Sequence, residues 1–427
     1  MILLNFLPIL TFIFIYVGTG IYFSLSGIHN AFYQLSATVA IIPAIALGWI
    51  LHKGSTQDKM NSFINGIRHP DIITMCIIFL LAGAFTSVTN SIGSVDSTIN
   101  LALSLISPKF LLIGIFLTSA FISIAIGTSM GTIATIAPIA AGIAYQGVFS
   151  PVIAMATVVG GAMFGDNLSL ISDTTIAAVM SQEADMKSKF KLNAIVALIA
   201  SAITIAILLF TQDTNVTIAF KDYSLILVLP YLFLIGLALA GINVFIVLFM
   251  SIIFAGGIGY LHHGYSIFSL SNDMVKGFSS MHEIMLLSLM VGGLSGLANK
   301  NSKELTDYFA RLITKFKNQY KIAQLMIAAI VSIFDILLAN NTIAIIFTGD
   351  IARDIAKRYN IPAHYSAAWL DIFSCVFQGI IPYGAQILLA SSIGNISPLT
   401  IIPHVYYCYI LAIVSIVFIL FNKPKTN

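Results

Sequence analysis

Apolar runs of about 20 residues recur along almost the whole chain, and they constrain its fold more than any other feature. Each run is long enough to cross the hydrocarbon core of a bilayer as a helix. Only 9% of the 427 residues are charged, whereas 58% are hydrophobic, and a soluble domain cannot cover its surface with so few charges. The sequence therefore predicts an all-α polytopic membrane protein with no separate soluble domain.

The expected crossings are ten in number, and two of them are interrupted by polar residues. Two more apolar stretches, 110–147 and 321–358, each contain a short polar turn, and we interpret them as re-entrant hairpins. The interrupted spans, 150–180 and 363–392, are interpreted as broken helices. The uninterrupted spans are expected at 4–25, 31–51, 71–90, 192–211, 223–241, 242–261, 283–298 and 403–422.

The two halves of the chain repeat the same order of elements. The triplet Thr132-Ile133-Ala134 recurs as Thr342-Ile343-Ala344, which is 342 − 132 = 210 positions later. Pro151 opens the first interrupted span and Pro362 the second, 362 − 151 = 211 positions later. Two matches at nearly the same offset predict a duplicated unit, with halves at 1–211 and 212–427.

The basic residues indicate how these elements are oriented. They cluster in 52–70, 187–191, 299–321, 353–358 and the C-terminal tail. All of these clusters fall on the cytoplasmic side only if both polar-tipped pairs are re-entrant hairpins and the two halves are inverted. We therefore expect a multi-pass protein of the inner cell membrane with cytoplasmic N- and C-termini, in which no Lys or Arg, Lys189 included, lies within the membrane.

The connector at 302–317 has apolar residues at helical spacing with basic residues between them. This pattern favours an amphipathic helix that lies on the inner leaflet. A solvated linker helix is the alternative.

The segment Gly160 to Thr175 is the strongest functional signal, because it places two aspartates, an asparagine and four hydroxyls between apolar runs. Carboxylates at membrane depth are costly and mark ion pathways. We expect Asp166 to bind Na⁺ and to accept a proton, so that the two ions compete for one group. The alternative is that Asp166 only caps a half-helix. Asp173 is expected to be either a cap or a ligand, and the sequence does not decide between the two.

Two polar half-sites are expected to face one another near the midplane. Hard cations such as Na⁺ favour the carboxylate, hydroxyl and amide oxygens that these half-sites contain, whereas zinc and copper prefer thiol and imidazole groups. For the lone acids Asp335 and Asp371, the alternative to a functional role is a structural hydrogen bond to a neighbouring helix. The expected first-half residues are Asp166, Asn167, Ser169, Ser172, Asp173, Thr128, Ser129 and Thr132, and those of the second half are Asn340, Asn341, Thr342, Asp335, Asp371, Gln378 and Gln386.

Three motifs resemble those of the NhaC-type Na⁺/H⁺ antiporter family. They are the segment 160–175, the hairpin tip 127–136 and the second-half break 381–385. The resemblance implies the ion-transporter superfamily fold, with inverted repeats, two hairpins and an elevator-like motion in a homodimer. It also implies secondary transport coupled to Na⁺ or H⁺, without fixing the substrate.

The sequence thus predicts a secondary active transporter, most simply a Na⁺/H⁺ antiporter with its cation site at 160–175. Coupled transport of a small organic substrate, such as an amino acid or a carboxylate, is the alternative. An intramembrane aspartyl protease is disfavoured because no Tyr-Asp dipeptide occurs, and no Walker A loop indicates ATP hydrolysis. We expect no enzymatic activity, no nucleic-acid partner and no cofactor, with membrane lipids, Na⁺ and H⁺ as the partners.

Overall fold

The computed structural model describes residues 7–26, 34–105, 107–170, 172–211, 222–240, 242–297, 313, 315 and 318–421, and its secondary structure is helical. The helices of the first half are α1 (Leu7–Leu25), α2 (Ala37–Leu51), α3 (Thr56–Ile67), α4 (Pro70–Ser91), α5 (Ser94–Leu105), α6 (Pro108–Ile126), α7 (Ser129–Tyr145), α8 (Pro151–Leu168), α9 (Asp173–Gln182) and α10 (Met186–Phe210). Those of the second half are α11 (Leu225–Leu239), α12 (Val244–His263), α13 (Ile267–Leu297), α15 (Gln319–Leu338), α16 (Asn341–Arg358), α17 (Ala363–Gln378), α18 (Ala385–Gly394), α19 (Pro398–Ile401) and α20 (Tyr406–Phe421).

The apolar helices confirm a multi-pass membrane protein. Among the described residues, seven helices are long and apolar enough to cross a bilayer, or eight if the bent pair at 385–404 is one span, and five shorter apolar helices accompany them. Most helices begin within a few residues of their predicted spans. One exception is α13, which begins at Ile267 rather than 283, and α3 and α5 fill connectors where no helix was predicted. The predicted amphipathic helix at 302–317 lies outside the described residues, apart from Ile313 and Lys315.

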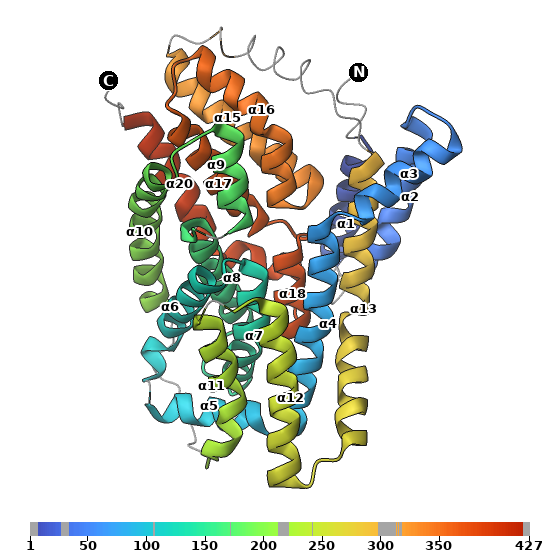
Figure 1. Ribbon diagram of the computed structural model, residues 1–427, viewed down its shortest axis with the longest axis vertical. Coiled ribbons are helices and arrows are strands. Elements are labelled where there is room, and N and C mark those ends of the chain that lie inside the picture. The colour runs from blue at the N-terminus through green and yellow to red at the C-terminus, as the bar shows by residue number, and fades with distance from the viewer. Residues whose placement is uncertain are drawn as a thin grey trace.

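Both predicted hairpins turn with the same backbone conformation. At the first tip, Gly127 adopts the left-handed region (φ 77°) and Thr128 is extended, after which α7 begins. At the second tip, Ala339 (φ 50°) and Asn340 repeat these conformations before α16. The equivalent residues are 339 − 127 = 212 and 340 − 128 = 212 positions apart. Figure 1 shows α15 and α16 at one end of the molecule and α6 and α7 in its opposite half.

Both predicted breaks are also present. Helix α8 ends at Leu168 and α9 begins at Asp173, whereas α17 ends at Gln378 and α18 begins at Ala385. The caps that open α8 and α17 are Ser150 and Pro362, again 362 − 150 = 212 positions apart. The triplet match at offset 210 was therefore misaligned by two positions, because Thr132 lies four residues beyond its extended tip residue and Thr342 only two beyond Asn340.

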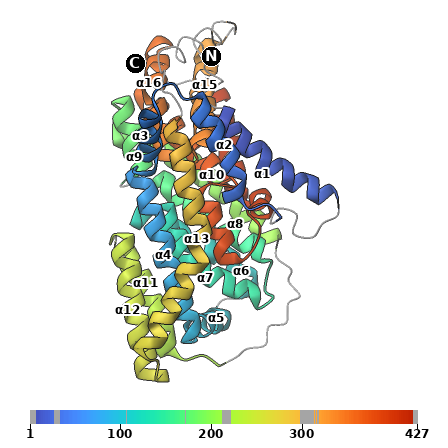
Figure 2. The same cartoon turned by 90° about the vertical axis from the view of Figure 1, so that its right-hand side faces the viewer.

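The helices of the two halves pack reciprocally. The second hairpin arm α7 packs on α18 of the other half, and its counterpart α16 packs on α9. In the same way α2 contacts α13, while α12 contacts α4, and α4 and α13 lie along one another (Figure 2). This reciprocity is what two inverted copies of one unit would give, although the exact division at residue 211 stays a prediction.

Helix α8 lies unusually close to α6, and its glycines make that approach possible. A Cβ atom added to Gly165 would stand 2.3 Å from the Ser123 Cβ, and one added to Gly161 would stand 2.5 Å from the Phe116 carbonyl oxygen. The Ser123 hydroxyl donates across this contact to the Ala162 carbonyl oxygen at 2.7 Å. The glycines that begin the 160–175 motif therefore fix the end of α8, where Asp166 lies, against the first hairpin.

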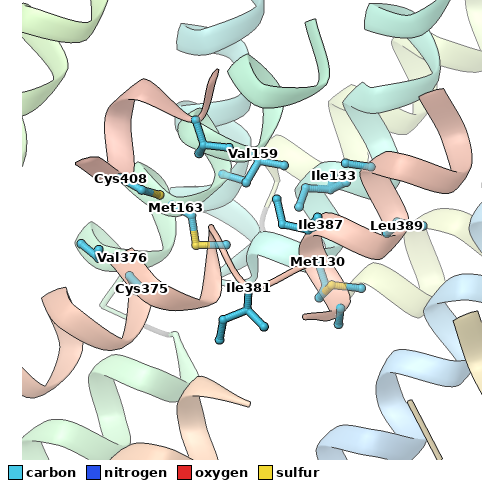
Figure 3. Close-up of a cluster of buried hydrophobic side chains, with 14 of the residues drawn as sticks. Met130, Ile133, Val159, Met163, Cys375, Val376, Ile381, Ile387, Leu389 and Cys408 are labelled. Carbon is cyan, nitrogen blue, oxygen red and sulfur yellow. The ribbon is translucent and has the colours of Figure 1, made fainter. Parts of the chain in front are cut away.

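An apolar cluster surrounds the two breaks. Figure 3 shows side chains of α7, α8, α17, α18 and α20 gathered in this region. They are completely or almost completely buried. This packing holds the broken helices in place and excludes water from behind them. The labelled members are Met130, Ile133, Val159, Met163, Cys375, Val376, Ile381, Ile387, Leu389 and Cys408.

Candidate functional site

Asp166 lies at the end of α8, is only 3% exposed, and has a hydrogen-bond donor on each carboxylate oxygen. The Ser129 hydroxyl, at the start of α7, donates to Asp166 Oδ2 at 2.8 Å. The Ser172 hydroxyl, from the break before α9, donates to Asp166 Oδ1. The first hairpin tip and the first break therefore meet at this carboxylate, as the sequence predicts.

A small cavity of about 70 Å³ opens beside Asp166. Four helices of both halves, α7, α9, α16 and α18, begin at its wall, so that their positive dipole ends converge there. Its lining residues are Thr74, Met75, Ile78, Thr128, Ser129, Met130, Asp166, Ser172, Asp173, Thr174, Asn340, Asn341, Thr342, Gln378 and Gln386. Ten of the fifteen predicted site residues thus share one cavity.

The second half reaches Asp166 through a chain of amides. Gln386 Nε2 donates to the Ser129 hydroxyl at 3.2 Å, and Ser129 in turn donates to Asp166. Gln378 Nε2 donates to Gln386 Oε1 at 2.6 Å and to the Ala339 carbonyl oxygen at 3.3 Å. The two half-sites are therefore one hydrogen-bonded unit rather than two separate sites.

At the second hairpin tip, asparagine side chains cap the helix that follows. Asn340 Oδ1 accepts the Ile343 backbone N–H at 2.9 Å, and Asn341 Oδ1 accepts that of Thr342 at 3.1 Å. These side-chain oxygens already accept hydrogen bonds at the start of α16, although both residues line the cavity. Asp173 is the first residue of α9, so Ser172, and not Asp173, occupies the N-cap position. The Asp173 side chain is exposed.

Three predicted ligands of the first half direct their side chains elsewhere. Thr132 donates to the Thr128 carbonyl oxygen at 3.1 Å, and Ser169 to the Ile124 carbonyl oxygen at 3.1 Å. Asn167 Oδ1 accepts from Asn193 Nδ2 at 2.6 Å, on α10. These residues support the backbone around the site and do not line the cavity beside Asp166.

Asp335 and Asp371 are both fully buried, but neither lines that cavity. Asp335, near the end of α15, has no hydrogen-bond partner for either carboxylate oxygen among the described residues. Asp371, on α17, forms an ion pair with Lys189, whose Nζ stands 2.5 Å from Asp371 Oδ2. Lys189 is therefore buried inside the protein, whereas its position relative to the membrane stays a prediction.

The helix that carries Lys189 begins earlier than the predicted span. Helix α10 begins at Met186, about two turns before the predicted 192, and Lys189 lies in its first turn with 1% exposure. The signal that sequence reasoning missed is Asn193, which follows Lys189 at i+4 and so lies on the same face of the helix. A lysine followed at that spacing by an amide marks a polar stripe that continues into the span.

The chemistry of the cavity suits a small hard cation. Its wall offers carboxylate, hydroxyl and amide oxygens. In the described part of the chain no three His, Cys, Asp or Glu residues gather as a transition-metal site would require. A volume of about 70 Å³ accommodates an ion with a few waters, since a single water needs roughly 10–15 Å³ of such space. Pockets for organic ligands are roughly 300–1,000 Å³.

Comparisons with known proteins agree with this chemistry. The sequence model described as the Na⁺/H⁺ antiporter family matches residues 2–212. A malate-2H⁺/Na⁺-lactate antiporter of Bacillus subtilis is 24% identical over 420 residues, covering 89% of this chain and 86% of its own. The Na⁺/H⁺ antiporter NhaC of the same organism is 23% identical, covering 90% of each chain. The crystal structure of the Alcanivorax borkumensis YdaH transporter aligns with 91% of this chain and 97% of its own at 12% identity, with a TM-score of 0.44.

Proposed function

Because this chain belongs to the NhaC-type Na⁺/H⁺ antiporter family, we propose that it exchanges Na⁺ for H⁺ across the membrane at Asp166. The observation that carries this proposal is a buried carboxylate, held by two hydroxyls, beside a cavity of about 70 Å³ that residues of both halves line. A cavity of this size is well below the roughly 300–1,000 Å³ of pockets for organic ligands.

The exchange follows from competition at one group. A carboxylate surrounded by protein can be neutralised either by a bound cation or by a proton, and an uncompensated charge there is costly. Na⁺ at Asp166 would take oxygen ligands from Ser129 and Ser172, whose hydroxyls already contact the carboxylate. Since the two ions exclude one another, release of Na⁺ on one side and of H⁺ on the other gives antiport.

The orientation of the protein is part of the same proposal. Figure 1 shows α3, α9 and α16 toward one end of the molecule. The exposed Lys187 lies in the first turn of α10, directly after α9, and the exposed Lys357 and Arg358 lie in the last turn of α16. An excess of Lys and Arg marks the cytoplasmic side, so we place this end, with both termini, in the cytoplasm of a cell whose inner membrane the protein crosses. The family resemblance further implies a homodimer, which the mass of the purified protein in detergent would test.

The test is proton movement in proteoliposomes that contain the purified protein and a pH-sensitive dye. Addition of Na⁺ outside should release protons from the wild-type protein without any organic solute. Asp166→Asn should abolish this response, whereas Asp96→Asn, which changes an exposed carboxylate in the first turn of α5, should leave it intact. Normal exchange by Asp166→Asn would contradict the proposal.

One observation favours a second candidate function. The four helix starts at the cavity are positive dipole ends, and such ends bind carboxylates. A relative that spans most of this chain is a malate-2H⁺/Na⁺-lactate antiporter. If Na⁺ alone moves no protons, and lactate or malate restores the response, the protein is a coupled carboxylate transporter whose cavity enlarges in another conformation.

A further inference from the structure

Lys189 is one of the largest completely buried side chains of the protein. Its ammonium group lies 2.5 Å from Asp371 Oδ2 and 2.7 Å from the Thr175 hydroxyl. The three residues come from α10, α17 and α9, and therefore from both halves of the chain. A lysine is seldom buried so completely without a specific partner, because its charge must be compensated.

The groups around this ammonium are those of a cation site. Asp371 supplies a carboxylate, Thr175 a hydroxyl and Asn193 an amide that donates to Asp371 Oδ2 at 2.9 Å. The second carboxylate oxygen of Asp371 and the Asn193 side-chain oxygen are buried and have no hydrogen-bond partner among the described residues. One carboxylate with hydroxyl and amide neighbours is also the composition of the site at Asp166.

The two carboxylates are linked by a short path. Asn193 Nδ2, which contacts Asp371, also contacts Asn167 Oδ1 at 2.6 Å and the Asn167 carbonyl oxygen at 3.1 Å. Asn167 directly follows Asp166 in α8. Any cation that bound at Asp371 would therefore be carried by the same group of helices as a cation at Asp166.

We propose that the Lys189 ammonium is a tethered cation that fills a second cation site at Asp371, so that each chain binds one exchangeable cation, at Asp166. This inference rests on the proposed function. Without Lys189, the carboxylates of Asp166 and Asp371 would require two mobile cations between them. With Lys189, the pair at Asp371 stays neutral throughout the cycle, and Asp166 is neutral with either Na⁺ or H⁺. The exchange is then one Na⁺ for one H⁺ and does not respond to membrane potential.

Equilibrium binding of radioactive ²²Na⁺ to the purified, detergent-solubilised protein tests this inference by counting saturable sites per chain. We expect one site in the wild type and none in Asp166→Asn, because Lys189 occupies the other. Lys189→Met should raise the count to two, and Lys189→Met combined with Asp371→Asn should return it to one. The double variant is the matched control, since it removes both charges of the pair and leaves no unpaired buried charge.

The outcomes separate this inference from the proposed function. A wild-type protein that binds no Na⁺ overturns both. A wild type with one site and a folded Lys189→Met that also has one site overturns only the role of Lys189. If Lys189→Met does not fold, Na⁺ binding to Asp166→Asn gives the test. A Na⁺ site that remains in this variant and is lost on adding Asp371→Asn means that Lys189 does not block Asp371, and the inference fails.

Discussion

The contact between α6 and α8 should not tolerate a single added methyl group at Gly165. In Gly165→Ala, the new Cβ would stand 2.3 Å from Ser123 Cβ, 2.5 Å from the Ala120 carbonyl oxygen and 2.8 Å from the Ile124 nitrogen. Two of these neighbours are backbone atoms, which cannot rotate away. Ordinary Cβ contacts begin at 3.4 Å, so the two helices must separate by about 3.4 − 2.3 = 1.1 Å.

Separating the two helices would lower the free energy of unfolding. Overpacking of this kind typically costs about 1–3 kcal/mol. The hydrogen bond from Ser123 to the Ala162 carbonyl oxygen, now 2.7 Å, would be stretched beyond hydrogen-bonding range, and its loss adds roughly 1 kcal/mol. We expect Gly165→Ala to lower the free energy of unfolding by about 2–4 kcal/mol. It should also weaken Na⁺ binding, because Asp166 is the next residue.

Thermal unfolding in detergent measures this effect, with a thiol-reactive dye that reports exposure of the three buried cysteines. Gly114→Ala is the matched control, because Gly114 lies on α6, the helix against which Gly165 packs, and an added Cβ there meets nothing within 4 Å. Its melting temperature should stay equal to that of the wild type or rise slightly, since Ala favours helix over Gly. Equal melting temperatures for Gly165→Ala and Gly114→Ala would refute the close packing of α8 on α6.

Two further predictions concern the first hairpin tip and the orientation of the molecule. Gly127→Ala should lower stability by roughly 1–2 kcal/mol, because Gly127 has φ 77° and a residue with a Cβ is strained there; an unchanged melting temperature would contradict the left-handed turn. Cysteines introduced by Lys187→Cys and Lys357→Cys should react with an impermeant reagent only from the cytoplasm, and one introduced by Ser266→Cys, between α12 and α13, only from outside; labelling of all three from one side would contradict the proposed topology.

Much of the fold could be predicted because the bilayer restricts it so strongly. Apolar length predicts a span, and a polar interruption within such a run predicts a turn or a break. The tips at Gly127 and Asn340 and the break before Asp173 are therefore readable from composition alone. The position of Asp166 followed from the same reasoning, since a buried carboxylate in a break is unlikely to lie there without a function.

What could not be predicted depends on tertiary packing. Nothing in the sequence indicates that the Thr132 and Ser169 hydroxyls donate to backbone carbonyl oxygens. Nor does it indicate that those of Ser129 and Ser172 donate to Asp166. The burial of Lys189 depends on Asp371, which is 371 − 189 = 182 positions away, so no local pattern around the lysine identifies its partner. Charge counting assigned Lys189 to a cytoplasmic loop because that method cannot recognise a compensated charge.

The repeat offset of 212 leads to one last prediction about two equivalent positions of which only one carries a charge. It pairs Asp166 with Gln378 (378 − 166 = 212), and both residues lie at the end of a broken half-helix and line the same cavity. The duplicated fold thus offers two equivalent positions, of which one has a carboxylate and the other its uncharged amide counterpart. The double variant Asp166→Asn with Gln378→Asp moves the carboxylate to the equivalent position of the other half. It should restore part of the Na⁺-driven proton movement that Asp166→Asn alone abolishes. Gln378→Asp alone should bind a second cation or retain a proton, because it adds a buried carboxylate close to Asp166. A double variant no more active than Asp166→Asn, although folded, would mean that the two positions are equivalent in backbone only and that the cation depends on Ser129 and Ser172 as much as on the charge.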